Sequence, residues 1–386
     1  MKSKNDWGRL GLISNYETRP LGELVEFVAK GIPPKYATEK TEDTIAVLNQ
    51  KTNRNFKIDY KLARLNDLSK KKVSIEKMLI ANDVLINSTG VGTAGRIAQL
   101  FSVPEPTTVD GHMIIVRADS DKINPIYLGY ALKAQQKVIE DLQEGSTGQT
   151  ELNRHRLLNE IEISFPSDTE KQGEIASLFL SLDNRISENE KINHHLEQIA
   201  FAIFDDMFPN VSLGSKLVGE YIVPKRGKGL LSKDAIAGKV PVVAGGLQPA
   251  TYHNTANTVA PVITISASGA NAGYVNLWSV PVWSSDSSFI DSSMSQDVYF
   301  WYVMLKKRQQ EIYESQTGSA QPHIYPKHIE ILPTIELSQE SISVFTTRVT
   351  PIFTQIGNNF DEIQVLQNTR DVLLPKLISG DISVTD

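Results

Sequence analysis

The sequence contains no cysteine among its 386 residues. A disulfide framework, a thiolate zinc site and a cysteine nucleophile are therefore excluded. It also lacks any apolar run approaching the roughly 20 residues that a membrane-spanning helix needs. The first 16 residues are polar and charged rather than typical of a signal peptide. We expect a cytoplasmic protein with no membrane segment.

The chain has little excess of charge of either sign, with 39 Lys and Arg against 45 Asp and Glu, a net charge of -6. Hydrophobic residues make up 40% and charged residues 22%, which is typical of a folded globular protein and excludes general disorder. Because a domain has about 150 residues on average, the length predicts two domains.

The distribution of charge matters more than its sum. A net negative charge argues against nucleic-acid binding. Counted as Lys+Arg minus Asp+Glu, the charge is +1 for 1–18, +1 for 19–166, -6 for 167–208, +2 for 209–334 and -4 for 335–386. The acid is thus concentrated in two segments, which are also compatible with solvated helix faces. The asymmetry permits DNA binding by the rest of the chain without demonstrating it.

An internal repeat organises the sequence. Three pairs of segments are similar: 19–25 and 211–218, 83–97 and 260–275, and the Thr-Gly pairs at Thr147 and Thr317. The second pair reads as an apolar strand, a glycine-rich turn and another strand. The distance between copies shrinks from 192 to 170 positions, so loops differ in length while the scaffold persists. The chain is predicted to contain two related modules.

Each half ends in a long amphipathic pattern. Apolar residues recur every three or four positions from Ile342 to Leu377, and the same stripe occurs 170 positions earlier. This spacing is typical of a coiled-coil seam between the two copies. The residues predicted to pair the helices are Ile175, Leu182, Ile186, Leu196, Phe345, Ile352, Ile356, Phe360 and Ile363.

Three residues indicate where the two helices are interrupted or end. Pro351 is expected to kink or delay the second helix near its start, whereas Pro209 and Gly380 are expected to end the two helices. The two helices can pair in either sense. An antiparallel pair would place the modules at opposite ends of a rod of roughly 60 Å.

Basic and hydrogen-bonding side chains cluster outside the helices in both halves. These are the types that contact base edges and phosphates, although such clusters are also common on solvated surfaces. In the first half, DNA contacts are predicted at Lys51, Arg54, Lys57, Lys61, Ser88, Thr89, Arg96, Thr147, Gln149, Asn153, Arg154 and Arg156. In the second half, they are predicted at Lys225, Arg226, Lys228, Asn271, Tyr274, Thr317, Ser319, Gln321, His323 and Tyr325.

No motif predicts a catalytic residue or a metal ligand. The glycine-rich run 88–96 lacks the Gly-Lys-Ser/Thr ending of a nucleotide-binding loop. Three interpretations remain: a loop that binds a nucleotide phosphate, a tight turn in the sheet, or a turn that also approaches DNA. Asn124-Pro-Ile-Tyr127 resembles the base-gripping loop of amino-methyltransferases, but Ile126 replaces a proline and the S-adenosylmethionine loop is missing. We expect a helix start there. The seven histidines have no metal-binding spacing.

The order and duplication of these segments resemble the specificity subunit of Type I restriction-modification enzymes over 19–386. The segments that carry the resemblance are Leu-Gly-Glu-Leu at 21–24, Thr-Gly-Gln at 147–149, Ile-Ala-Phe-Ala-Ile-Phe at 199–204, and Leu-Leu-Pro-Lys-Leu-Ile-Ser-Gly-Asp-Ile at 373–382. The second copy departs from the pattern at Ser319, which stands where the first copy has Gln149.

The resemblance implies two target recognition domains that read the halves of a bipartite, gapped site in double-stranded DNA. It implies that the paired helices set the gap and bind two methyltransferase subunits, which restriction subunits join. The chain itself would be non-catalytic and bind no cofactor. S-adenosylmethionine, ATP and Mg²⁺ would belong to the partner subunits.

The fold class predicted is α+β, with two tandem α/β target recognition domains, each followed by a long helix, and the two helices paired as an antiparallel coiled coil. The predicted boundaries are an N-terminal segment 1–18, domains at 19–166 and 209–334, and helices within 167–208 and 335–386. Two alternatives remain: the recognition subunit of a stand-alone or Type IIB-like methylation system, and a small-molecule enzyme that uses its glycine-rich turns.

Overall fold

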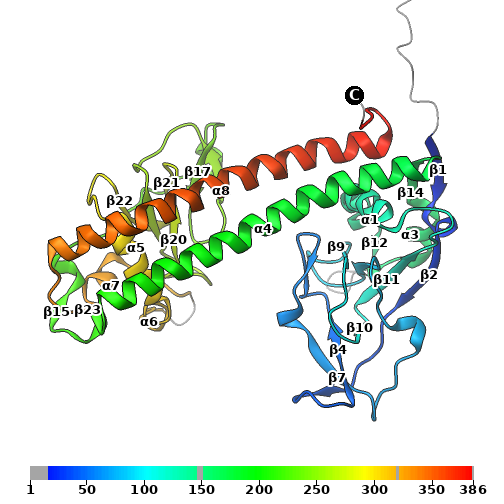
Figure 1. Cartoon of the computed structure of the whole chain (residues 1–386), viewed down its shortest axis with the longest axis horizontal. Helices are drawn as coiled ribbons and strands as arrows, with labels where there is room; N and C mark the ends of the chain where they lie inside the picture. The colour runs from blue at the N-terminus through cyan, green and yellow to red at the C-terminus, as the bar shows by residue number, and fades with distance from the viewer. Residues whose placement is uncertain (1–15, 146–150, 319–320, 385–386) are drawn as a thin grey trace, which may run out of the picture. The chain divides into compact units, whose positions relative to one another are not determined.

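Two long helices, α4 (Thr169–Met207) and α8 (Gln339–Ser379), dominate the secondary structure (Figure 1). The structure is a computed structural model that describes residues 16–145, 151–318 and 321–384. By their contacts, the described residues of 16–184 and 366–384 form one compact unit, and those of 185–365 form a second. Each long helix therefore contributes to both units.

The first unit contains two four-stranded sheets. Its elements are β1 (Tyr16–Pro20), η1 (Leu21–Glu23), β2 (Val25–Lys30), β3 (Tyr36–Ala37), β4 (Thr44–Leu48), β5 (Asn53–Arg54), β6 (Lys57–Ile58), η2 (Tyr60–Leu62), β7 (Arg64–Asp67), η3 (Ile75–Lys77), β8 (Val84–Asn87), β9 (Ile97–Gln99), β10 (Thr107–Val109), β11 (Met113–Ala118), α1 (Pro125–Ala134), α2 (Gln136–Glu140), β12 (Gln143–Glu144), β13 (Glu151–Leu152), α3 (Arg154–Glu160) and β14 (Glu162–Pro166). One sheet is antiparallel with the order β2-β11-β8-β9. The other has the order β10-β4-β7-β3, with β10 parallel to β4, and β1 pairs with β14.

The second unit repeats this plan. Its elements are η4 (Val211–Leu213), β15 (Lys216–Leu217), η5 (Val218–Glu220), β16 (Lys225–Arg226), η6 (Ser232–Asp234), β17 (Val240–Val243), β18 (Thr251–His253), β19 (Val262–Ser266), β20 (Val275–Trp278), β21 (Trp283–Ser284), β22 (Ser287–Asp291), α5 (Val298–Lys307), α6 (Gln309–Glu314), α7 (Pro326–Glu330) and β23 (Pro333–Thr334). The order β16-β22-β19-β20 matches β2-β11-β8-β9, and β21 runs parallel to β17 as β10 does to β4. The duplicated α+β fold is thus confirmed in the sheet topology.

One copy of the repeat begins later than predicted. In the structure, the counterpart of Leu21-Gly22 in the second copy is Val218-Gly219 and not Leu213-Gly214. The amides of Leu21 and Val218 donate to equivalent carbonyls, those of Ile161 and Leu332, at 2.8 and 2.9 Å. A Cβ on Gly22 or Gly219 would lie 3.1 Å from a carbonyl oxygen of the helix packed against it, which favours glycine at this place in both copies. Gly214 has a separate reason, since a Cβ there would lie 2.1 Å from the carbonyl oxygen of Thr334.

The helix α1 begins where the sequence indicated. The side chain of Asn124 accepts hydrogen bonds from the amides of Ile126 and Tyr127, and Pro125 occupies the first turn. Tyr127 and Tyr130 are fully buried in the core of the first unit, against Phe179 of α4. Asn124 therefore has a capping role, as expected of a helix start.

The two long helices pair antiparallel within each unit. In the first, Arg370 of α8 donates to Asp183 of α4. In the second, Phe204 packs edge-on against Phe345, and Arg185 pairs with Glu362. Of the predicted pairing residues, Ile175, Ile186, Phe345, Ile356 and Ile363 are buried, whereas Leu182, Leu196 and Ile352 are partly buried.

One expectation about α8 was wrong, and another was wrong in one of its two alternatives, the delay of the helix start by Pro351. Phe360 is 53% exposed, because an apolar period of three and four also selects residues beside the seam. Pro351 does not delay the helix, which begins at Gln339 and continues through both Pro351 and Pro375. The expected ends hold, since α4 ends at Met207 and α8 at Ser379, before Gly380 with a φ of +79°.

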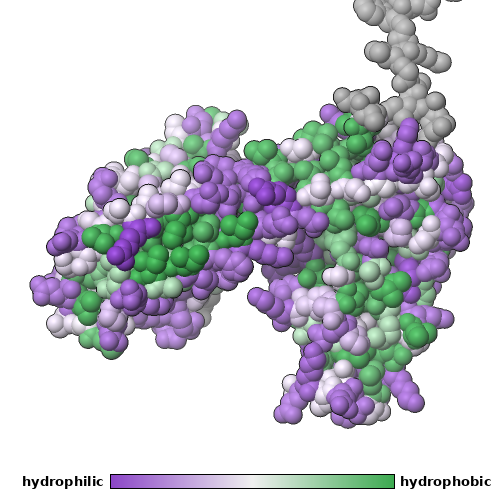
Figure 2. Space-filling view, viewed as in Figure 1, coloured by the Kyte–Doolittle hydropathy of each residue, from purple (hydrophilic) through white to green (hydrophobic). Residues whose placement is uncertain are grey.

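Apolar side chains also gather on the outside of the helix pair. Figure 2 shows them over α4 and α8 in the second unit. On α4, Ile192 and Ile199 are 43% and 50% exposed. Among the described residues, no helix combines the length and the apolar content of a membrane span.

Candidate nucleic-acid interface

A glycine-rich turn connects β8 to β9 in the first unit. Gly90, Gly92 and Gly95 all have positive φ, the region that glycine adopts most readily. A Cβ on Gly95 would lie 2.6 Å from the Cα of Glu140, so the turn also packs closely on α2. The segment is thus a tight turn between antiparallel strands, one of the three readings of the sequence.

A basic hairpin is attached to this turn. Strands β5 and β6 carry Arg54 and Lys57 at the surface. The side-chain amide of the buried Asn53 donates to the Oδ1 of Asn87 at 3.1 Å and to the carbonyl of Arg96 at 3.0 Å. Asn87 in turn donates to the carbonyl of Gln50. These amides fix the hairpin next to the turn.

A third segment, 151–156, adjoins the same turn. The amide of Leu152 donates to the carbonyl of Ser88 at 2.7 Å, and Thr89 forms a β-bridge with Glu151. The Oγ1 of Thr89 also lies 2.8 Å from the Nδ1 of His112. Three separate segments therefore meet in the first unit: 50–58, 88–96 and 151–156.

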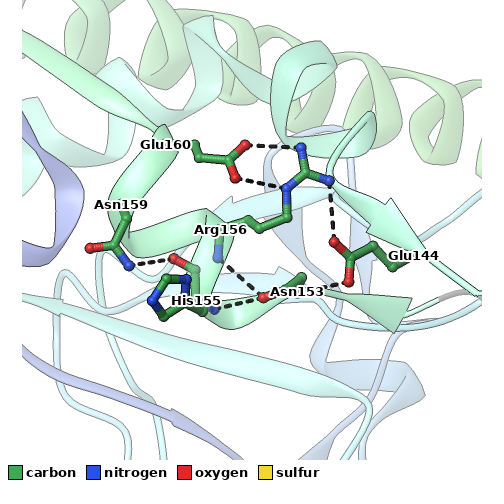
Figure 3. A network of polar contacts seen from close by, with 6 residues as sticks. All are labelled: Glu144, Asn153, His155, Arg156, Asn159 and Glu160. Carbon is green, nitrogen blue, oxygen red and sulfur yellow. Dashed lines mark hydrogen bonds and ion pairs between the residues drawn. The ribbon is translucent and has the colours of Figure 1, made fainter.

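Two residues predicted to bind DNA, Asn153 and Arg156, have hydrogen-bond partners within the first unit (Figure 3). Asn153 caps α3 by accepting from the amides of His155 and Arg156, and it donates to Glu144 at 2.7 Å. The guanidinium of Arg156 binds both carboxylate oxygens of Glu160 at 2.9 Å and also contacts Glu144. The hydrogen bond to Arg156 lowers the pKa of Glu160. A DNA contact by Arg156 would have to replace these carboxylates.

The second unit repeats the contact between the glycine-rich turn and the polar segment. Ser268, in the turn between β19 and β20, forms a β-bridge with His323, as Thr89 does with Glu151. The amide of Ile324 donates to the carbonyl of Ala267 at 2.9 Å. From β16, Arg226 donates to Asp286 at 2.6 Å, and Asp286 also accepts from Ser268. Segment 267–273 thus meets residues 321–325 as 88–96 meets 151–156, whereas 225–228 lies on β16, which corresponds to β2 and not to the hairpin 50–58.

The predicted contact residues fall into distinct groups. Those exposed on the described segments are Lys51, Arg54, Lys57, Lys61, Arg154, Lys225, Arg226, Lys228, Thr317, Gln321 and Tyr325. Those partly buried are Thr89, Arg96, Asn153, Arg156, Asn271, Tyr274 and His323. Thr147, Gln149 and Ser319 lie outside the described residues.

Three candidates lie away from the surface where the segments meet. Ser88 is fully buried, and we leave it out of the proposed surface. Lys61 lies in η2, outside the segment 50–58, and its amide donates to the carboxylate of Asp59. Tyr274 lies beneath the amino group of Lys306, 4.2 Å from its ring centroid, and lines a cavity next to the long helices.

Sequence reasoning missed the amides that hold the surface together. Asn53 and Asn87 are buried, and a polar residue at a strand end gives little sign of this. One available signal was that Asn87 ends the apolar run 84–86 directly before the glycine-rich turn. Buried side-chain amides at a strand end need hydrogen-bond partners, which the backbone of an adjacent segment can supply. Asn87 could therefore have predicted that another segment packs against the glycine-rich turn.

Comparisons with known proteins agree with this architecture. Residues 13–198 match the family model of the Type I restriction modification DNA specificity domain. The chain is 26% identical to the Type I restriction enzyme MjaIX specificity subunit of Methanocaldococcus jannaschii over 321 residues, which cover 72% of this chain and 74% of that one. It is 24% identical over 186 residues to the putative MjaX specificity subunit of the same organism, covering 47% and 42%.

A solved structure has the same fold. The S subunit of a Type I restriction-modification system from M. genitalium aligns with a TM-score of 0.58 at 22% identity, over 96% of this chain and 98% of that one. The fold and the paired surfaces define a two-module protein whose modules are joined by an antiparallel helix pair. Residues 13–198 thus match the Type I restriction modification DNA specificity domain, and the chain is similar to Type I restriction enzyme specificity subunits over most of its length.

Proposed function

We propose that the chain reads a bipartite DNA site, one half with each unit, through the surface where the three segments meet. The observation that carries the proposal is a repeated contact: in both units a β-bridge and a backbone hydrogen bond join a glycine-rich turn to a polar segment, and exposed cations lie on a strand segment nearby. A duplicated scaffold that presents different side chains suits two related but different half-sites.

The exposed cations of these segments are the proposed DNA contacts, with Arg54, Lys57 and Arg154 in the first unit and Lys225 and Lys228 in the second. Cationic side chains on loops can bind phosphates, which positions the protein, while neighbouring polar groups read base edges. Because each module has only a small positive charge, +1 for 19–166 and +2 for 209–334, DNA affinity of the isolated chain should be weak and steeply salt-dependent.

We further propose that the chain is a non-catalytic adaptor for methyltransferase and restriction subunits. Exposed apolar side chains on α4, such as Ile192 and Ile199, support a role of the helix pair in binding a partner, since exposed apolar patches mark interaction surfaces. S-adenosylmethionine would bind to the methyltransferase, and ATP and Mg²⁺ to the restriction subunit.

Methylome sequencing tests the proposal. A host that carries the chain and its methyltransferase should show one methylated bipartite motif, and deletion of the gene for this chain should remove that motif entirely. Persistence of the motif after deletion would refute the recognition role. A companion nuclease gene would separate a restriction system from a stand-alone methylation system.

A further inference from the structure

A cavity of about 290 Å³ lies within the second unit, between the long helices and the β20–α5 region. Its wall is rich in aromatic rings, including Trp278, Tyr299, Phe353 and Phe360. Tyr299 and Phe353 stack with their centroids 4.8 Å apart. The function proposed above does not use this cavity.

One carboxylate in the wall has an incomplete set of partners. Glu197 of α4 accepts a hydrogen bond from the hydroxyl of the buried Tyr302 at 2.5 Å. Lys306 also lines the cavity, but its amino group donates to the carbonyl of Val275 and lies over the ring of Tyr274. Within the described part of the chain, Glu197 forms no direct ion pair, although its charge partly offsets the burial that lowers the pKa of Lys306. The cavity wall therefore places a carboxylate among aromatic faces.

The corresponding place in the first unit is filled. A shift of 173 positions relates α1 to α5, pairing Lys133 with Lys306. The side chains of Gln136 and Gln309 support this shift, because each accepts a hydrogen bond from the first amide of the neighbouring strand, β9 or β20. The same part of both units can therefore be compared residue by residue.

The long helices differ at this place. A shift of 170 positions relates α4 to α8. By this shift, Asp183 of α4 corresponds to Phe353 of α8, and Ala200 of α4 corresponds to Arg370 of α8. In the first unit, the guanidinium of Arg370 donates to Asp183 at 2.6 Å, and Tyr130 and Lys133 contact the same carboxylate. In the first unit, the guanidinium of Arg370 is thus part of a buried ionic cluster around Asp183. The second unit has an alanine there and an open, acidic, aromatic cavity nearby.

We propose that this cavity binds an arginine side chain of a protein partner, which under the function proposed above is the methyltransferase subunit. A guanidinium stacks on aromatic faces and forms hydrogen bonds with a carboxylate, so it matches both features of the wall. The volume lies just below the range of typical small-molecule pockets, which fits one side chain better than a nucleotide.

Binding of a small probe tests the site itself. The probe is N-acetylarginine amide, added to the full chain while the indole resonance of Trp278 is followed by NMR and assigned with a Trp278→Phe variant. The arginine probe should shift this resonance, and the neutral isostere N-acetylcitrulline amide should not. Equal responses to both probes, or no response to either, would overturn the proposal.

Two variants locate the binding. Glu197→Gln, which keeps an acceptor for Tyr302, should weaken arginine binding about tenfold, equivalent to ~1.4 kcal/mol. Phe360→Ala removes an exposed ring of the wall and should also weaken it. The matched control is Asp205→Asn, an exposed carboxylate elsewhere on α4 that pairs with Lys307, and it should bind like the unmodified chain. Unchanged binding by both cavity variants would refute the site.

The partner is tested separately. Affinity of the methyltransferase for the full chain should fall about tenfold in Glu197→Gln and stay unchanged in Asp205→Asn. An equal affinity for both variants would refute the methyltransferase as the source of the arginine. If the unmodified chain and methyltransferase together fail to methylate any bipartite site, the proposed function fails, whatever the probe shows. If methylation is normal but the arginine probe does not bind, the cavity proposal is refuted and the proposed function stands.

Discussion

The side-chain amides of Asn193 and Asn359 meet inside the antiparallel helix pair, where the Nδ2 of Asn359 donates to the Oδ1 of Asn193 at 2.7 Å. Both residues are buried. Nearby, Asn189 donates to Glu362, which also binds Arg185. The seam of the second unit therefore contains a polar layer between apolar ones. In coiled coils a single buried asparagine fixes the register of the helices at some cost in stability.

Removal of one amide should cost more than removal of both. Asn193→Leu leaves the amide of Asn359 buried without its main acceptor, which should destabilise the helix pair by about 1–3 kcal/mol. Adding Asn359→Leu should restore most of this loss, because an apolar pair needs no hydrogen bond. Hydrogen exchange of α4 and α8 peptides measures the difference. Equal protection in the single variant and the unmodified chain would contradict a buried amide pair.

The absence of cysteine allows the register itself to be measured. In the unmodified background, a short bifunctional thiol reagent should cross-link Arg185→Cys with Glu362→Cys readily, since the long side chains of Arg185 and Glu362 meet across the helices. A pair shifted by about one turn, Arg185→Cys with Asn358→Cys, should not. In the double leucine background the shifted pair should begin to cross-link. If it never does, the asparagines do not specify the register.

A buried aspartate should make the first unit sensitive to acid. Burial alone would raise the pKa of Asp183, but the charges of Lys133 and Arg370 and hydrogen bonds from Arg370 and Tyr130 outweigh it, so the pKa is lowered. A carboxyl whose pKa is lower in the folded than in the unfolded state stabilises the fold above the unfolded value. This contribution is lost as pH falls from about 4 through the folded pKa.

Asp183→Asn isolates this contribution. At neutral pH the variant should be destabilised by about 3 kcal/mol, because Arg370 and Lys133 lose their buried partner. The difference from the unmodified chain should shrink as the pH is lowered through and below 4. Hydrogen exchange of α1 peptides over a pH series follows it. Asp371→Asn, at an exposed partner of Arg370, is the control and should show a much smaller effect.

The sequence predicted the scaffold well because its signals are apolar and periodic. Ile175, Ile186 and Phe345 lie in buried positions that the helical spacing indicated, and the glycine-rich turns lie between antiparallel strands as their composition suggested. The polar layer of the seam was missed because asparagine is normally a surface residue. Its signal was a gap: the apolar stripe skips from Ile186 to Leu196, and Asn189 and Asn193 occupy the missing positions.

The candidate surface was harder to predict from the sequence. Nearby segments could be grouped only by their repetition, because contacts between 50–58, 88–96 and 151–156 depend on the sheet topology. Individual roles depend on partners that spacing does not reveal. Arg156 and Arg154 have the same chemistry in the sequence, yet one is held by two carboxylates and the other is exposed.

The two glycines of the first turn should differ in their tolerance of alanine. Gly95→Ala combines a φ of +85° with a Cβ only 2.6 Å from the backbone of Glu140, so we expect a loss well above the 1–2 kcal/mol of a left-handed residue alone. Gly92→Ala, at φ +68° with no atom within 4 Å of its Cβ, should cost only that amount. Thermal unfolding of both variants compares them. An equal decrease in the free energy of unfolding of both variants would show that α2 moves to accommodate the added methyl group.

Two neighbouring arginines should affect DNA binding in different ways. Arg154→Ala removes an exposed cation and should weaken DNA binding by the assembled complex, reducing the slope of log affinity against log salt by about 1 if the contact is to phosphate. Arg156→Ala breaks contacts with Glu144 and Glu160 and should leave this slope unchanged. Filter binding over a salt series measures both. The same slope change in each variant would place Arg156 on the DNA as well.

The last prediction concerns the helices as a spacer between half-sites. Because α4 and α8 pair antiparallel, four residues must be inserted into both, after Ser187 in α4 and after Gln364 in α8, to keep facing segments matched. Four residues add about 6 Å, roughly one turn, so the apolar seam stays close to its phase. At about 3.4 Å per base pair, this length corresponds to nearly two base pairs of DNA.

The unspecified gap in the methylated motif should therefore lengthen by about two base pairs. Both half-site sequences should persist, because the segments that meet in each unit lie outside the inserted positions. Insertion into α4 alone is the matched comparison. It displaces Asn193 from Asn359 and should reduce methylation far more than the paired insertion does. Methylome sequencing of hosts carrying each variant gives the motif directly. An active paired variant with an unchanged gap, or with altered bases inside a half-site, would contradict the helices as spacer, because the added length would then have been absorbed without separating the two reading surfaces.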